Sequence, residues 1–183
     1  MRKYYAAALS LVLGFSSLVV HAQKDPMVGG AEMYPTKNIV ENAMNSKDHT
    51  TLVAAVKAAA LVDTLEGQGP FTVFAPTNEA FAKLPAGTVD TLLKPENKET
   101  LTKVLTYHVV AGKVTSKDLK KMIMNGGGKA EIKTVEGGTI IASIHGGKIV
   151  LTDEKGGMAM VTIADVYQSN GVIHVVNTVL MPN

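Results

Sequence analysis

The hydrophobic period changes once along this chain, and that change constrains the fold more than any other feature. Before residues 125–128 (Asn-Gly-Gly-Gly), apolar residues recur at helical spacing, as Leu101, Val104 and Leu105 do. After this point they alternate with period two, in short segments divided by glycine pairs, which is typical of strands. A chain with its helices in the first half and most of its strands in the second is predicted to adopt an α+β fold.

Two apolar segments are predicted to form the centre of the sheet. The segment FTVFA begins at Phe71, and Pro76 ends it because proline cannot donate to a strand ladder. The last segment, GVIHVVNTVLM, is apolar on both faces, as expected of a central strand. We expect these two segments to pair within one sheet.

The N-terminal residues are predicted to direct export. Arg2 and Lys3 precede an apolar run that ends in Val-His-Ala, so residues 1–22 have the pattern of a secretory signal peptide. Residues 23–35 are polar with two prolines and are expected to be a flexible lead-in to a domain over residues 36–183. The protein is therefore expected to be periplasmic or extracellular, without insertion in the membrane after cleavage.

Charge and cysteine content exclude several classes of function. Cleavage lowers the Lys+Arg count from 18 to 16, which equals the number of acidic residues. No arginine remains, although arginine carries most bidentate recognition of phosphates and base edges, so nucleic acid is not an expected partner. The absence of cysteine excludes disulfides and thiolate chemistry.

No catalytic motif is recognisable. The turn after Phe74 lacks both the G-x-S-x-G and the G-x-x-x-x-G-K patterns, and Thr77 has no base beside it in the sequence. Four histidines downstream of the signal peptide are far apart in sequence, which leaves a three-histidine zinc site without support. We expect no enzyme activity, no metal and no cofactor. Either His108 forms a surface recognition pair with Tyr107, or it is a buried histidine bonded to the backbone; for His174 the buried alternative is favoured.

Three segments in order resemble the fasciclin-like domain family, in particular its single-domain secreted bacterial members. They are FTVFAPTNEAF (residues 71–81), LTYHVVAGKV (residues 105–114) and NGVIHVVNTVLMP (residues 170–182). The resemblance implies a β wedge of two small sheets with helices packed on one side, and a structural role for the first segment. The positions it implies to be structural are Thr72, Phe74, Pro76, Thr77, Asn78, Phe81, Gly171, His174 and Asn177.

The same resemblance implies binding in place of catalysis. In animal members the Tyr-His region has been linked to integrin binding, so the implied binding residues are Tyr107, His108, Leu105, Val109 and Val110. The acidic motif of those members has only a divergent counterpart here, Asp118-Leu119. The leading hypothesis is an exported, monomeric adhesion or interaction module for an extracellular or cell-surface protein or glycan. The alternative is an envelope binding protein for a small apolar molecule, lipid or glycan in a pocket between helices and sheet.

Overall fold

The computed structural model describes residues 25–183, so the predicted signal peptide lies outside the described residues. In this range a two-stranded hairpin precedes a larger sheet with the strand order β4-β3-β9-β8-β7-β6-β5. The strands of the larger sheet are β3 (Phe71–Pro76), β4 (Val109–Ala111), β5 (Lys129–Lys133), β6 (Thr139–His145), β7 (Lys148–Thr152), β8 (Met158–Gln168) and β9 (Gly171–Val176). The α-helices are α1 (Ile39–Asn45), α2 (Thr50–Ala58), α3 (Val62–Glu66), α4 (Asn78–Ala82), α5 (Thr88–Leu92), α6 (Lys98–Tyr107) and α7 (Ser116–Asn125), with 3-10 turns at Lys47–His49 and Pro95–Asn97.

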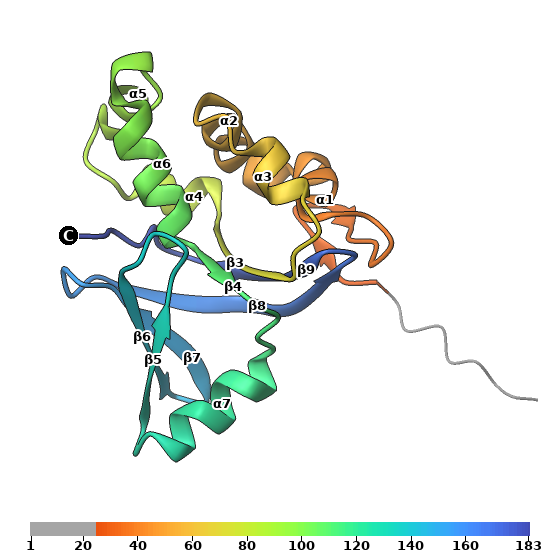
Figure 1. Cartoon of the computed structure of the whole chain (residues 1–183), viewed down its shortest axis with the longest axis vertical. Helices are drawn as coiled ribbons and strands as arrows, with labels where there is room; N and C mark the ends of the chain where they lie inside the picture. The colour runs from red at the N-terminus through yellow and green to blue at the C-terminus, as the bar shows by residue number, and fades with distance from the viewer. Residues whose placement is uncertain (1–24) are drawn as a thin grey trace, which may run out of the picture.

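The long strand β8 joins two halves of the sheet. Its first residues, from Met158 to Met160, pair with β7, and the remainder pairs with β9. The ladder with β9 shifts register between Val161 and Val166, and within that interval Asp165 adopts a left-handed φ of 60°. Bulges of this kind bend a strand. Figure 1 shows the result: β5, β6 and β7 run steeply across the direction of β3, β8 and β9, which is the wedge that the resemblance implied.

The predicted pairing of the two apolar segments is confirmed, because β3 and β9 lie side by side and parallel from Phe71↔Gly171 to Pro76↔Val176. Every residue of β9 is buried. Gly171 permits the close approach of the two strands, since a Cβ atom there would lie 2.0 Å from the carbonyl oxygen of Phe71.

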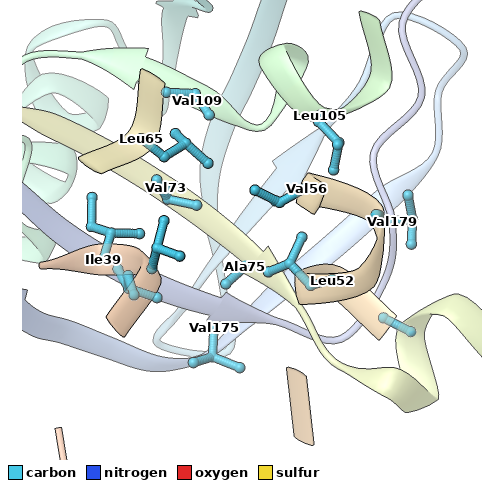
Figure 2. Close-up of a cluster of buried hydrophobic side chains, with 14 of the residues drawn as sticks. Ile39, Leu52, Val56, Leu65, Val73, Ala75, Leu105, Val109, Val175 and Val179 are labelled. Carbon is cyan, nitrogen blue, oxygen red and sulfur yellow. The ribbon is translucent and has the colours of Figure 1, made fainter. Parts of the chain in front are cut away.

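Two hydrophobic cores lie on opposite faces of this central pair. Val73 and Ala75 of β3 face one core, and Phe74 faces the other. In the first core, side chains from α1, α2, α3 and α6 point toward Val73 and Ala75, as Figure 2 shows. The second core contains Leu119 and Ile123 of α7 with residues of β5 to β8. Alternation along β3 and β9 therefore makes each of these strands part of both cores.

The helices divide between the two halves. In Figure 1, α1 to α6 gather over the side of β3, β4 and β9, whereas α7 lies at the opposite end against β5, β6 and β7. None of the helices within residues 25–183 combines the length and apolarity needed to cross a membrane.

The segment expected to be a flexible lead-in differs from the prediction. Residues 27–32 form a hairpin of β1 (Met27–Val28) and β2 (Ala31–Glu32). Val28 and Met33 are buried in the first core. The backbone N–H of Lys47 donates to the carbonyl of Gly29 at 3.1 Å, which fixes the hairpin to the turn after α1. The burial of Val28 and Met33 was not predicted from the sequence, because turn glycines and exposed residues surround them.

Candidate functional site

Tyr107 stands at the end of α6, where the chain turns into β4, and its side chain crosses to the other half of the sheet. It is fully buried. Its hydroxyl donates to the carbonyl of Thr139 at 2.8 Å and accepts from the backbone N–H of Glu154 at 3.2 Å. Burial raises the pKa of Tyr107 to about 12, so the phenol is neutral and keeps its donor proton. Tyr107 thus ties α6 to β6 and to the β7–β8 turn.

His108 next to it fixes the C-terminal segment. Its Nδ1 lies 2.8 Å from the carbonyl of Val104, and its Nε2 accepts from the backbone N–H of Leu180 at 3.0 Å. Because Nε2 accepts, the proton of the neutral ring is on Nδ1. Burial lowers the pKa of His108 to about 4, and the hydrogen bond to the Val104 carbonyl and the carboxylate of Asp153 only partly oppose this shift.

The five residues implied to form a recognition surface are all buried. Their exposed fractions are at most 6%. The implied binding residues are Leu105, Tyr107, His108, Val109 and Val110. Their burial contradicts direct contact with a protein partner in this conformation and favours the buried alternative for His108. Amphipathic side chains such as Tyr and His look alike in sequence whether they cover a surface or bridge a core.

The turn from β3 into α4 has a structural role. Thr77 caps α4 by accepting from the backbone N–H of Ala80. The side chain of Asn78 accepts from the N–H of Thr51 at 3.0 Å and donates to the carbonyl of Lys47 at 2.8 Å. Pro76 and Phe81 are buried beside it. This turn therefore holds α4 against the start of α2.

Thr72 and His174 together hold the loop before α7. The hydroxyl of Thr72 donates to the carbonyl of Gly112 and accepts from the N–H of Val114. The Nε2 atom of His174 lies 2.8 Å from the carbonyl of Val114, and its Nδ1 accepts from the N–H of Asp165. Burial lowers the pKa of His174, which keeps the ring neutral. Both ring nitrogens of His174 therefore contact backbone groups inside the fold.

Asp165 continues this network to α7 itself. Its carboxylate accepts from the backbone N–H of Ser116 at 2.7 Å and from the Ser116 hydroxyl. Phe74 stacks on the His174 ring with centroids 5.7 Å apart. The central strands thus hold the loop before α7 through Thr72 and His174, and the bulge of β8 holds the first residue of α7 through Asp165.

Two asparagines of the last motif brace distant segments. The side chain of Asn177 accepts from the N–H of Met160 at 2.8 Å. Asn170 accepts from the N–H of Ile39 and donates to the carbonyls of Leu65 and Gly67. Sequence reasoning quoted Asn170 within the motif but assigned it no role. The neighbouring Gly171 was assigned a structural role, whereas Asn170 was not. The partners of Asn170 lie more than 100 residues away in sequence, so the local motif does not indicate them.

An apolar cavity of about 60 Å³ lies between the helices and the sheet. Its walls come from α1, α2, α3, β3 and the junction of α6 with β4, and they include Leu105, His108 and Val109. Figure 2 shows part of this wall, where Leu65, Val73 and Val109 face one another. An engineered cavity of roughly 150 Å³ is large enough for benzene. The cavity here can therefore accept only a small group unless the half-buried lining residues move.

Among residues 25–183 there is no group of three or more side chains arranged to hold a metal ion. Asp118 and Leu119, the divergent counterpart of the acidic motif, point in different directions. Asp118 is exposed and closes a capping box with Thr115 at the start of α7, whereas Leu119 is fully buried.

Comparison with known proteins agrees with this architecture. A family model for the Fasciclin domain matches residues 47–182. Protein sll1483 of Synechocystis sp. is 43% identical over 185 residues, which cover 93% of this chain and 96% of the relative. Immunogenic protein MPB70 of Mycobacterium bovis is 37% identical over 145 residues, covering 76% of this chain and 66% of the relative.

The fold also matches a solved structure, that of a FAS1 domain pair from the insect cell adhesion molecule Fasciclin I. The TM-score is 0.72 at 20% identity, and the match covers 79% of this chain and 51% of that chain. At this identity the match concerns the fold alone. Because the family model spans most of the chain, the chain belongs to the Fasciclin domain family.

Proposed function

We propose that this protein is an exported, non-catalytic interaction module that binds cell-surface or matrix proteins or glycans. One observation carries the proposal: the polar motif side chains that could act as reactive groups, such as Thr77, Tyr107 and the two histidines, make structural hydrogen bonds inside the fold. His108 and His174 each use both ring nitrogens on backbone groups. Because these groups are already hydrogen-bonded inside the fold, we infer that partners bind to the outer surface.

Membership of the Fasciclin domain family supports the same proposal. The solved structure with this fold comes from a cell adhesion molecule. Contacts made by one small domain are weak individually, and their strength on a surface grows with the number of copies engaged. Adhesion would therefore depend on surface density more than on a deep pocket.

Binding of the purified exported protein, immobilised on a surface, to cells, matrix proteins and glycans tests the proposal. Saturable binding that soluble protein competes away is the expected result. An acid-unfolded sample on the same surface is the control, because it has the same composition without the folded outer surface. Binding of the folded protein no stronger than that of this control, across all three classes, would contradict the function.

The cavity supports a second candidate, an envelope binding protein for a small apolar molecule. Its lining is almost entirely apolar and reaches solvent beside half-buried residues of α2 and α3. Native mass spectrometry of the protein as isolated would detect a retained ligand. A Val53→Phe variant narrows the cavity from its half-buried rim, and loss of the ligand in this folded variant would place the ligand there. A ligand-free wild-type protein would count against this candidate, as does the small volume.

A further inference from the structure

The outer side of α7 carries a cluster that the motifs and the cavity leave unexplained. Its residues are Lys117, Lys120, Lys121 and Met124, which we call the α7 basic face. At 100° per residue these four fall within an arc of about 100° on the helix. All four are exposed, Met124 by 70%. Leu119 and Ile123 occupy the opposite side and are buried in the second core.

This arrangement costs the isolated fold electrostatic free energy. Lys117 repels Lys120 and Lys121, which lie three and four residues along the same helix. It also lies in the first turn, where the helix dipole disfavours a cation. Asp118 offsets part of this charge, but its carboxylate already accepts from Thr115 in the capping box. Within residues 25–183, no salt bridge involves these three lysines.

Charge is distributed unevenly along the chain, and the excess of lysine lies in and around α7. Residues 113–133 contain six lysines and two acidic residues, whereas the rest of the described chain contains nine lysines and fourteen acidic residues. In Figure 1, α7 lies at the end of the molecule away from α1 to α6. A dipole of this kind orients the protein so that α7 approaches a negatively charged surface first.

The helix is also presented rigidly. Val114, two residues before it, is bonded to Thr72 and His174, and Ser116 is bonded to Asp165. Little conformational entropy is therefore lost when the backbone of α7 meets a partner.

We propose that the α7 basic face docks the protein peripherally on an anionic phospholipid bilayer. The lysines match the negative headgroups in charge. Met124, beside them and 70% exposed, is a flexible apolar side chain. A bilayer offers this methionine an apolar region just below the charged layer, which a dissolved polyanion does not. This inference rests on the proposed function as an interaction module, and it names the surface on which the module gathers.

Vesicle cosedimentation tests the docking surface. The exported protein, with its N-terminus verified by mass spectrometry, is mixed with phosphatidylglycerol–phosphatidylcholine vesicles or with pure phosphatidylcholine vesicles. One variant carries Lys117→Gln, Lys120→Gln and Lys121→Gln. The matched control carries Lys57→Gln, Lys94→Gln and Lys98→Gln, which changes net charge equally at exposed lysines of the helical end. A Met124→Ser variant tests the apolar contribution.

We expect binding to phosphatidylglycerol vesicles that weakens with added salt and is absent on phosphatidylcholine. Each lysine near an anionic surface contributes roughly a five-fold factor in affinity, so the α7 variant should bind about 100-fold more weakly. The control should bind within a few-fold of wild type, and Met124→Ser should bind measurably less. Circular dichroism establishes that each variant is folded.

Two results would overturn the proposal. One is an equal loss of vesicle binding in the α7 variant and in its control. The other is no vesicle binding by the wild type, including the case in which the wild type binds a soluble anionic polysaccharide. Neither of these results bears on the binding assay with cells and matrix proteins that tests the proposed function. Vesicle binding without any such partner would instead contradict the proposed function and leave the docking surface intact.

Discussion

Single polar side chains inside this protein join parts of the chain that are far apart. Tyr107 is the clearest case, because its one hydroxyl serves both β6 and the turn between β7 and β8. A buried hydroxyl is favourable only while both of its partners are in place. The Tyr-His pair is thus important to the domain without being exposed, and its effect on binding would pass through folding.

Tyr107→Phe should lower the free energy of unfolding by about 1–3 kcal/mol, because it leaves the carbonyl of Thr139 and the N–H of Glu154 without their partner. Urea unfolding followed by circular dichroism measures the change. Tyr34→Phe is the matched control, since the Tyr34 hydroxyl is bonded only to the exposed Glu32 carboxylate. Equal effects of the two substitutions would show that the Tyr107 hydroxyl is not a structural tie.

Buried histidines should make the fold sensitive to mild acid. Burial lowers the pKa of His49, His108 and His174 below the ordinary value of 6.5, to about 4 for His108. The unfolded chain therefore takes up protons below pH 6.5 that the folded chain does not. Stability is fully present above pH 6.5 and falls as the pH drops toward 4, by up to about 1.4 kcal/mol per pH unit for each histidine.

Urea unfolding at several pH values between 7.5 and 4.5 measures this slope. His108→Gln removes one titrating ring, so its stability should depend less steeply on pH than that of the wild type, whatever its stability at neutral pH. A variant that is simply destabilised would shift the whole curve without changing its slope. An unchanged slope in His108→Gln would contradict the buried neutral state of this histidine.

At the scale of elements, the parallel contact between β3 and β9 depends on a residue without a side chain. A Cβ at Gly171 would collide with the Phe71 backbone at both its oxygen and its nitrogen. We expect Gly171→Ala to destabilise the protein by about 1–3 kcal/mol or more, because backbone cannot move aside as a side chain can. Chemical denaturation measures this effect, and a loss below about 0.5 kcal/mol would mean that the strands separate without cost.

Sequence patterns predicted the elements better than their contacts. Helical spacing predicted α6 and the position of the helices in the first half of the chain, and the apolar runs predicted the central pairing, because these patterns reflect burial of one or both faces of an element. The hairpin of β1 and β2 was missed, since strands of two residues are too short for any period. A pocket between helices and sheet was the alternative hypothesis, but the residues that line the cavity could not be predicted, because they come from six separate elements.

The surface position implied for the binding residues differs from their burial for a related reason. Leu105, Val109 and Val110 were expected at a surface beside Tyr107, although their apolar character fits a core equally well. A motif indicates that a family keeps certain residues together, and it does not distinguish a tie between elements from a contact with a partner. In this chain the hydrogen bonds of Tyr107 and His108 decide between them.

At the scale of the whole molecule, two cores share one pair of strands. Val175 of β9 belongs to the core under α1 to α6, and Phe74 of β3 to the core under α7. A strand that is buried on both faces cannot leave one core without leaving the other. The two ends of the molecule, which look separate in Figure 1, should therefore unfold together.

Val175→Ala and Phe74→Ala test this coupling from opposite sides. Each should cost about 2–5 kcal/mol, because each leaves a cavity in a core whose side chains are almost fully buried. Hydrogen exchange followed by mass spectrometry reports opening of α2 and α7 separately. If the molecule unfolds as one unit, either substitution should speed the global exchange of both helices to the same extent. If Val175→Ala speeds exchange in α2 and leaves α7 unchanged, the halves open independently, and β3 and β9 connect them without coupling them.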